Sequence, residues 1–540
     1  MILIRIIFLF LLNVLSYYLC AQNTIGVTVN TEQTYEGYTL ISSISDNNVY
    51  LIDNCGRVVH EWELECDRGV AAYIDKDGNL YKSCRTPGFA NTGGVTGAIQ
   101  KLSWDGNLKW NFHLANTQYH LHHDFDILPN GNILVLAYEK IELEDWRNLG
   151  STIAGNIDFI QSEAILEIRQ EGLDSFEIVW EWHLTDHFVQ DLSPEYPNFA
   201  AVNVEKRKLD INSSSTGPAA DRIHFNSIRY NEALEQIIVS AKHLNEVFII
   251  EKTDNSEIAS KGEGGKYGFG GDFLYRFGNG ENYGLIDTSR LAIGEQHNIQ
   301  WVPNSNTNIT IFNNSTDSSR TRSEALEVLL PVTDGRYGID ENENFEDISV
   351  IWSLDELSGS AFKSRIMSGV QRLSNDNYLI GVADEKSLTE VDIDGNIVWK
   401  YIVPIRNGEP MQQGDNQALA ATIFNANKYS PLYQGFEGRD LKPSDPIELN
   451  FDITECLAVS TSDAGEAEVL EVEINNGMLY ITNQDNELQL NVLTATGSEV
   501  IDMQLPYGVN EINLTNLHRG LYFISVSNKK TVKSYKYLKH

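Results

Sequence analysis

The stretch GEQHNIQWVPN at residues 294–304, followed by ITIFNN at 309–314, decides our interpretation of the fold. It has the pattern of a strand with alternating faces, a polar turn and a second strand, with a histidine at its start. Related phrases begin at His123 and His224, and each histidine has an asparagine seven positions later, at the turn. A fourth copy, residues 368–381, has serine in place of histidine. The chain therefore repeats a β-unit with three histidines at one equivalent position.

Repeats of this kind predict an all-β protein, a six-bladed β-propeller. Strands that end in tryptophan, such as those at Trp62, Trp110 and Trp399, indicate the outer hairpins of the blades. Equivalent residues of a propeller lie at one height around its axis, so histidines from several blades are expected to meet in one pocket. The innermost strands of the predicted blades lie near Val70, His123, His224, His297, Ser368 and Ala421.

The composition excludes several classes of partner and cofactor. Lys+Arg 40 against Asp+Glu 76 gives a formal net charge of −36, which disfavours nucleic acid and anionic membrane surfaces. The Gly-rich run at 262–271 does not predict a phosphate-binding loop, because Lys266 is followed by Tyr267 rather than by Ser or Thr. After the first 21 residues no stretch is long and apolar enough to span a bilayer.

The N-terminal end of the chain predicts export. Residues 1–21 combine Arg5, an apolar run and the ending Leu-Cys-Ala, and we interpret them as a signal peptide that is cleaved near Gln22. The mature chain then enters an oxidising compartment, where two of its first three cysteines are expected to form a disulfide. The sequence leaves the pairing open among Cys55, Cys66, Cys84 and Cys456.

The predicted propeller domain covers residues 22–456 and is followed by a polar linker at 457–472 and a small β-sandwich at 473–540. In that sandwich, LHRGLY at 517–522 and KKTVK at 529–533 resemble the C-terminal sorting domains of type IX secretion cargo. The resemblance implies passage by way of the periplasm, transfer by the type IX secretion machinery, and a secreted or cell-surface protein. A passive adhesion module is the alternative, because small sandwiches serve many functions.

Five phrases in the predicted propeller resemble the bacterial arylsulfate sulfotransferases: HHDF at 122–125, WEWH at 180–183, HFNS at 224–227, QHN at 296–298 and IFNANKYS at 423–430. The resemblance implies a six-bladed propeller that moves a sulfuryl group from an aryl sulfate donor to a phenolic acceptor. It implies a ping-pong mechanism through a sulfohistidine, without metal, nucleotide or other cofactor. The family includes dimers, so a homodimer is an open alternative.

The same resemblance implies the roles of four residues. His297 is the expected nucleophile, and His123 and His224 are the other histidines of the channel. Lys242, in SAKH, stands where the family has arginine; lysine keeps the charge but loses the two-pronged geometry that matches sulfate oxygens, and His243 is the alternative for this place. The histidines and Lys242 can surround the sulfuryl oxygens, and His224 or His123 can transfer the phenol proton.

Other interpretations compete with a sulfotransferase. Single histidines in a propeller are often structural, although three at one repeat position favour a shared site. Strand alternation sends His120 and His122 to one face and His123 to the other, which argues against a three-histidine metal site. His187 is expected to shape an insertion near the channel mouth. The alternatives are a non-catalytic secreted propeller that binds sulfated or phenolic ligands or glycans, and an aryl sulfate hydrolase.

Overall fold

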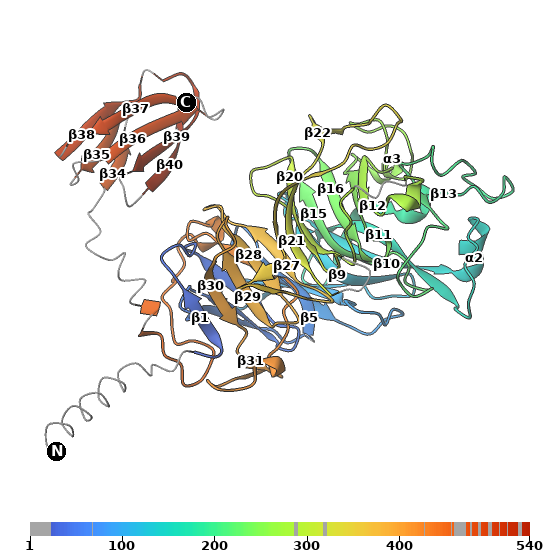
Figure 1. Ribbon diagram of the computed structural model, residues 1–540, viewed down its shortest axis with the longest axis horizontal. Helices are drawn as coiled ribbons and strands as arrows, with labels where there is room; N and C mark the ends of the chain where they lie inside the picture. The colour runs from blue at the N-terminus through green and yellow to red at the C-terminus, as the bar shows by residue number, and fades with distance from the viewer. Residues whose placement is uncertain are drawn as a thin grey trace, which may run out of the picture. The chain divides into compact units, whose positions relative to one another are not determined.

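Six antiparallel sheets of four or five strands make up the main part of the chain that the structure describes (Figure 1). This computed structural model describes residues 23–66, 68–285, 290–316, 321–425, 427–454 and 456–457, and then 471–475, 478–483, 488–494, 499–506, 508–515, 517–527 and 532–539. The predicted signal peptide and most of the predicted linker lie outside these residues. Contacts divide the chain into two units, Met1–Cys456 and Leu457–His540.

The first three sheets of the first unit follow one another along the chain. The first contains β33 (Asn427–Tyr429), β2 (Tyr38–Ser42), β3 (Asn48–Ile52) and β4 (Val58–Glu63). The second contains β5 (Arg68–Ile74), β6 (Leu80–Arg85), β7 (Gly97–Leu102) and β8 (Leu108–His113). The third contains β9 (Tyr119–Ile127), β10 (Ile133–Glu142), β11 (Phe159–Gln170) and β12 (Phe176–His183).

The other three sheets continue this order. The fourth contains β15 (Phe225–Asn231), β16 (Gln236–Ala241), β17 (Glu246–Glu251) and β18 (Tyr275–Gly278). The fifth contains β19 (His297–Trp301), β20 (Asn308–Asn313), β21 (Glu324–Leu329) and β24 (Ser349–Leu354). The sixth contains β27 (Gly369–Arg372), β28 (Tyr378–Val382), β29 (Ser387–Val391), β30 (Ile397–Ile402) and β1 (Gly26–Asn30).

Two sheets are completed by strands from the opposite end of the unit. Strand β1 pairs with β30, and β33 pairs with β2. The strand that begins the first sheet is therefore Asn427–Tyr429, and the prediction of an inner strand near Ala421 is wrong by several residues. The all-β class is confirmed, whereas six blades remain our interpretation of these sheets.

Aromatic side chains connect each sheet to the next in one cyclic order. A tryptophan or tyrosine on an outer strand donates a hydrogen bond to the following sheet, and the sixth sheet donates back to the first. The six bonds are Trp62 to Ser103 O, Trp110 to Ser175 O, Trp180 to Thr253 Oγ1, Tyr275 to Glu346 O, Trp352 to Ile393 O and Trp399 to Asn54 O. These bonds satisfy the buried polar atoms that large aromatic side chains bring into a core.

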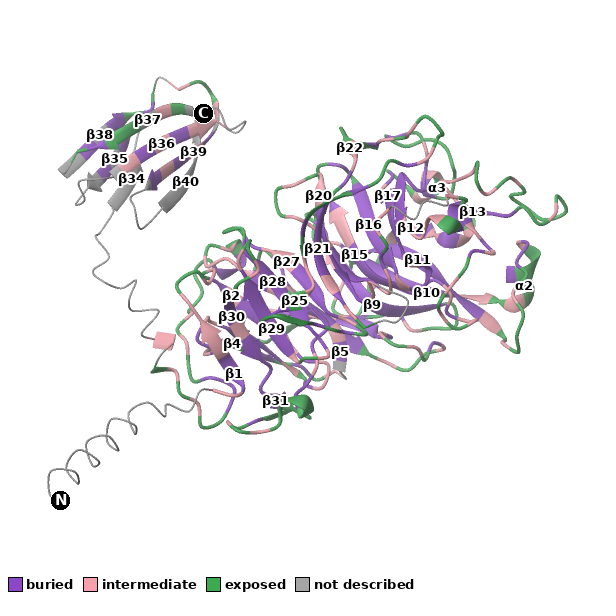
Figure 2. Cartoon of the chain, in the orientation of Figure 1, coloured by how far each residue is buried: buried purple, intermediate pink, exposed green. Residues whose placement is uncertain are grey.

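The sheets are apolar on both faces because each is covered by neighbours on two sides. Along β10, Leu134 and Leu136 pack in one buried cluster with Trp182 and Phe225. Val135, the residue between the two leucines, faces the opposite way, into a second buried cluster. The central strands are accordingly purple, the colour of buried residues, along most of their length in Figure 2.

Two disulfides stabilise the first unit. Cys66 pairs with Cys84, as expected for two of the first three cysteines. Cys55 instead pairs with Cys456, 401 positions later. This second bond ties the end of the first unit to the turn before β4, which the spacing of the cysteines did not indicate.

The second unit has two antiparallel sheets with an apolar core of its own. One contains β34 (Glu471–Asn475), β35 (Met478–Asn483) and β38 (Gly508–Asn513); the other contains β37 (Glu499–Leu505), β36 (Leu488–Thr494), β39 (Gly520–Ser527) and β40 (Val532–Lys539). The core includes Leu479, Ile481, Leu490, Val492 and Ile524. In the parts of the chain that the structure describes, no helix has the length and apolar character needed to cross a bilayer.

Candidate functional site

The predicted site residues come together: His123 lies within β9, His224 directly before β15, and His297 at the start of β19. The ring centroids of His123 and His224 are 4.6 Å apart. Asn226, two residues after His224, donates to the carbonyl of Gln296, directly before His297, at 2.7 Å. The backbone N–H of Lys242 donates to the carbonyl of His224 at 3.1 Å. His123, His224, His297 and Lys242 therefore form one cluster, which we call the histidine cluster.

Irregular backbone turns the histidines inward, within β9 and at the start of β15 and β19. In β9 three residues, 122–124, face the single residue Leu136, because the ladder shifts register there. His123 and His224 have positive φ angles of 51° and 61°, in the left-handed region that non-glycine residues seldom adopt. A bulge of this kind re-aims side chains next to a functional site.

The bulge also corrects the expectation about alternation. His122 and His123 are in contact, with 2.9 Å between their Nδ1 atoms, rather than on opposite faces. His120 lies apart from them, with its ring nitrogens facing the N–H of Ala90 and the carbonyl of Thr86. The regular two-residue period applies only to an unbroken strand, so the prediction for His122 was wrong.

Hydrogen bonds determine which nitrogen of His297 carries the proton. Its Nδ1 lies 2.9 Å from the carbonyl of Glu295 and 2.8 Å from Asn314 Oδ1. The amide nitrogen of Asn314 donates to the carbonyls of Ser364 and Met367, so its oxygen is the atom facing His297. Both neighbours of Nδ1 are acceptors, and Nδ1 must therefore donate. The lone pair of the neutral ring is consequently on Nε2.

The surroundings keep His297 neutral. Its side chain is buried, and burial together with the charge of Lys242 lowers its pKa to about 3. The hydrogen bonds from Asn314 and Glu295 act in the opposite direction but are outweighed. An unprotonated imidazole with Nε2 free is a nucleophile, so the chemistry expected of His297 is available at neutral pH.

His224, like His297, donates a hydrogen bond through Nδ1, in this case to a carboxylate. Its Nδ1 lies 2.7 Å from Asp221 Oδ2, and the hydroxyl of Tyr138 lies 3.0 Å from the same nitrogen. Asp221 and Tyr138 are both buried. A histidine that donates through Nδ1 to a buried carboxylate is oriented for proton transfer at Nε2.

His123 has a different support, made of a second histidine and a buried acid. His122 lies between them, with Nδ1 near His123 Nδ1 and Nε2 3.1 Å from Glu163 Oε2. The other oxygen of Glu163 accepts the N–H of Phe225 at 2.9 Å. Burial lowers the pKa of both histidines well below its usual value, and burial raises the pKa of Glu163 well above its usual value.

Lys242 and His243 both belong to this region. They lie in the short helix η2 (Lys242–Leu244), and 3.5 Å separates Lys242 Nζ from His243 Nε2. His243 donates through Nδ1 to the carbonyl of Asp221 at 2.7 Å, and burial lowers its pKa to about 4. His243 is therefore neutral, and the positive charge of this pair is on Lys242.

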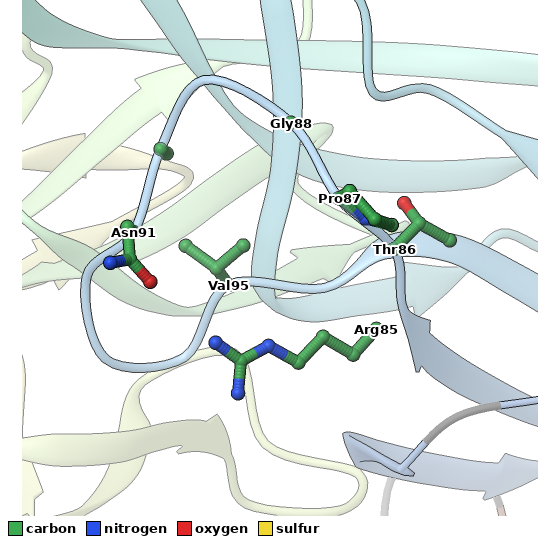
Figure 3. A pocket seen from close by; sticks show the side chains of 7 residues that line it. Arg85, Thr86, Pro87, Gly88, Asn91 and Val95 are labelled. Carbon is green, nitrogen blue, oxygen red and sulfur yellow. The ribbon is translucent and has the colours of Figure 1, made fainter.

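A loop between β6 and β7 covers His123 and lines an open cavity. The N–H of His123 donates to the carbonyl of Gly94 at 2.7 Å. Gly94 has φ +74°, and a Cβ on it would lie 2.0 Å from His123 Nε2, so only glycine fits here. The cavity, of about 470 Å³, is lined by Arg85, Thr86, Pro87, Gly88, Ala90, Asn91 and Val95 (Figure 3).

The lining of this cavity suits an anion. None of its residues is acidic, in a chain with a net charge of −36. In Figure 3 the side chain of Arg85 runs beneath the loop toward Asn91 and Val95. Among the described residues no carboxylate forms an ion pair with Arg85. A guanidinium in this state is ready to bind an oxyanion from solution.

Comparison with known proteins identifies the family of the chain. A family model described as arylsulfotransferase (ASST) matches residues 24–398, more than half of the chain. The chain belongs to the arylsulfotransferase family. A second model, described as a secretion system C-terminal sorting domain, matches residues 475–540. This arylsulfotransferase is thus made with a tail that supports export by type IX secretion to the cell surface or beyond.

Solved structures similar to this arylsulfotransferase are distant. A protein of unknown function from Bacteroides caccae is 12% identical at TM-score 0.40, over 73% of this chain and 98% of the other. The Pseudomonas aeruginosa periplasmic gluconolactonase is 11% identical at TM-score 0.35, over 91% and 98%. A streptogramin B lyase is 10% identical at TM-score 0.33, over 73% and 88%. A search of curated proteins gave no match.

Several supporting residues of this arylsulfotransferase were not predicted from sequence. Asp221 stands three positions before His224, a spacing that could have suggested the pair. Glu163 interrupts the buried strand β11, and an acid within an apolar run is a recognisable signal. Asn314 ends the stretch ITIFNN at 309–314, and nothing in that stretch indicates its contact with His297. Tyr138 has no local signal, because only folding brings it to His224.

Two groups of histidines with acidic partners in this arylsulfotransferase are explained by hydrogen bonding. Asp221, His224 and His243 have atoms close enough to hold a metal ion, within 4.8 Å of one another. Asp221 already accepts from both rings, and Lys242 lies beside them, which favours a hydrogen-bonded group over a cation site. His187 is bonded to Asp272 at 2.7 Å and stacked on Trp182, so its side chain has structural partners; its place near a channel mouth stays a prediction.

Proposed function

We propose that this arylsulfotransferase moves a sulfuryl group from an aryl sulfate to a phenol by a ping-pong mechanism, with His297 Nε2 as the covalent nucleophile. The observation that carries the proposal is the arrangement of hydrogen bonds around His297. Nδ1 donates to Glu295 and Asn314, and burial beside Lys242 keeps the ring neutral. The reactive lone pair is thereby directed away from the supporting residues and toward the cluster.

In the first half-reaction Nε2 of His297 attacks sulfur and the bond between sulfur and the aryl oxygen breaks. The bonding electrons leave on the phenoxide, which takes a proton from His123 or His224. In the second half-reaction the acceptor phenol gives its proton to the same group, its oxygen attacks sulfur, and the S–N electron pair returns to Nε2. Lys242 stabilises the sulfuryl oxygens as charge redistributes, a contribution worth several kcal/mol in a dry site.

The alternatives differ from this proposal in testable ways. A hydrolase would use water in the second half-reaction, and a binding protein would not need a nucleophile at position 297. The burial of His123 and His297 limits the access of water and favours transfer to a phenol over transfer to water. We also propose that residues 1–21 direct the chain to the periplasm and are cleaved off near Gln22. The C-terminal domain then directs the chain across the outer membrane.

The deciding experiment uses 4-nitrophenyl sulfate with and without phenol, and intact mass after donor alone. We expect release of 4-nitrophenol to depend on phenol, and the protein to gain the mass of one sulfuryl group. His297→Gln should lose both. Because the pKa of His297 is about 3, the mass gain should persist at pH 5, where an ordinary histidine would be mostly protonated.

The matched control is His183→Gln, which changes a histidine of the third sheet that is bonded to Glu139 outside the cluster. It should retain turnover and mass gain. Release that needs no phenol would support the hydrolase instead. Absence of release and of mass gain across several donors would support the binding protein.

A further inference from the structure

We propose that Glu163 and His122 form a proton relay behind His123, so that the proton of the phenol is stored on Glu163 instead of on an imidazole of the histidine cluster. The inference rests on the proposed function and goes beyond it, because it assigns positioning roles to two residues that do not face the cluster. His123 is the group that contacts the phenol, and the other two act through it.

The three groups form an unbroken chain of hydrogen bonds. His123 Nδ1 and His122 Nδ1 are 2.9 Å apart, and His122 Nε2 and Glu163 Oε2 are 3.1 Å apart. The side chains of His122 and Glu163 are fully buried, with 0% exposure each. The ring of His122 is stacked on Tyr138, with 3.8 Å between centroids, and cannot turn freely.

This chain has two arrangements of hydrogens, and they differ at His123 Nε2. With Glu163 ionised, His122 donates through Nε2 to Glu163, His123 donates through Nδ1 to His122, and His123 Nε2 has a lone pair. With Glu163 protonated, its hydroxyl donates to His122 Nε2, His122 donates through Nδ1 to His123, and His123 Nε2 carries hydrogen. The first arrangement is a base toward the phenol, and the second is an acid.

Electrostatics favour storage on the acid. His123 is faced by His224, His297 and Lys242, and Tyr138 and Asp221 lie behind His224. An imidazolium at His123 would add a second buried positive charge beside that of Lys242. Protonation of Glu163 instead changes a buried anion to a neutral group. The raised pKa of Glu163 and the lowered pKa values of both histidines agree with this direction.

The steps balance in both half-reactions. When the acceptor reacts, its O–H proton moves to His123 Nε2, the Nδ1 hydrogen of His123 moves to His122 Nδ1, and the Nε2 hydrogen of His122 moves to Glu163. The phenoxide oxygen bonds to sulfur, and the S–N electron pair returns to His297. When a donor aryl group leaves, the three hydrogens move back and the phenoxide departs as a phenol. No other reactant is required.

The test compares Glu163→Gln with the wild type using donors of different leaving-group strength. Glutamine keeps the shape and hydrogen bonds of the site but cannot store the proton. The leaving group of 4-nitrophenyl sulfate needs little protonation. With this donor we expect the rate of the first-turnover burst to stay within about twofold of the wild-type rate. Transfer to phenol, and first turnover with unsubstituted phenyl sulfate, should fall by about 100-fold or more, as for loss of general acid–base catalysis.

Glu139→Gln is the matched control, because Glu139 is a buried acid of the same sheet, bonded to His183 and not to the cluster. This variant should react with both donors at the wild-type rates. Equal losses for both donors in Glu163→Gln would overturn the relay in favour of a structural role, and no loss would overturn it in favour of His224 and Asp221. A wild type without burst would instead overturn the proposed function.

Should Glu163→Gln fail to fold, the wild type itself provides the measurement. The rate of phenyl sulfate turnover in mixtures of H2O and D2O reports how many hydrogens move in the limiting step. Three transfers along the relay predict a curved dependence on the deuterium fraction. A linear dependence would mean that one hydrogen moves, and would overturn the proposal.

Discussion

Each histidine of the cluster makes a hydrogen bond through Nδ1, and each does so with a different kind of partner. Each binds a neighbour through Nδ1: His297 binds a carbonyl and an amide, His224 a carboxylate, and His123 a second histidine. With Nδ1 occupied, Nε2 is the atom left for chemistry in every case. The partners differ in basicity, which suits the proposed division in which one ring is the nucleophile and the others transfer protons.

Arg85 provides a test of how the donor is recognised. An aryl sulfate is anionic, and Arg85 lies in a cavity without acidic residues beside the loop that covers His123. Arg85→Gln is expected to raise KM for 4-nitrophenyl sulfate by about 10-fold with a smaller effect on kcat, the size of one hydrogen bond to a charged group. Arg85→Lys should recover part of the loss. Steady-state kinetics at constant ionic strength measures both.

Arg365→Gln controls for a general loss of positive charge, since Arg365 is exposed and bonded to Asp384 at 3.0 Å. It should leave KM unchanged. An unchanged KM in Arg85→Gln as well would show that the cavity takes no part in donor binding.

At the scale of elements, the inner strands supply the site and the outer strands hold the sheets in order. The inner strands β9, β15 and β19 are irregular at the cluster, where bulges sacrifice ladder hydrogen bonds to turn side chains inward. The outer strands are bonded across sheets by buried aromatic donors. The proposed reactive residues thus lie on the inner strands and the bonds between sheets on the outer strands. Substitutions on the outer strands should therefore leave the reaction rate unchanged.

The bond that returns from the sixth sheet to the first is expected to contribute to stability. Trp399 is fully buried and donates to the carbonyl of Asn54 at 2.8 Å. Trp399→Phe removes this donor and leaves some empty space, so the free energy of unfolding should fall by about 1–3 kcal/mol. Urea denaturation of the purified protein gives this value, and kcat should be unchanged under native conditions.

Trp301→Phe is the comparison, because the buried indole N–H of Trp301 has no acceptor among the described residues. Its replacement should change the free energy of unfolding by less than about 1 kcal/mol. If the two variants were equally destabilised, the loss would come from packing and the bond to Asn54 would contribute nothing.

Across the whole molecule, the proposed catalytic site and the sorting domain lie in separate units. The sheets, the histidine cluster and both disulfides lie in Met1–Cys456, and the sorting-domain match begins at residue 475. The chain has a formal net charge of −36, which disfavours the approach of anions in general. A donor that is itself an anion then depends on local positive groups such as Lys242.

Termination after Leu457 is expected to separate the two functions. The shortened chain keeps Cys456 and its bond to Cys55, so its kcat for 4-nitrophenyl sulfate should stay within about twofold of the full chain, because its core and disulfides are intact. In the native host it should accumulate inside the cell envelope. Cell fractionation with an activity assay measures both, and appearance of the shortened enzyme in the medium would contradict the role of the tail.

The repeat at His123, His224 and His297 predicted the all-β class and a shared site for these histidines. The family and Lys242 were predicted from five phrases that resemble the arylsulfate sulfotransferases. The sequence also predicted the sorting domain from short phrases. Local spacing carries this information because strands and turns follow from neighbouring residues. Spacing alone did not reveal that Ala421 lies before, and not within, the strand at Asn427–Tyr429.

The hydrogen-bond partners of the clustered histidines came from the tertiary structure and not from the sequence. The tautomer of His297 depends on Asn314, and the orientation of His224 depends on Tyr138 as well as on its neighbour Asp221. The contact of His122 with His123 arises from a bulge, and its partner Glu163 is 41 positions away on another strand. Buried polar groups find partners across sheets, and desolvation then sets their pKa values, so these properties belong to the fold and not to any stretch of sequence.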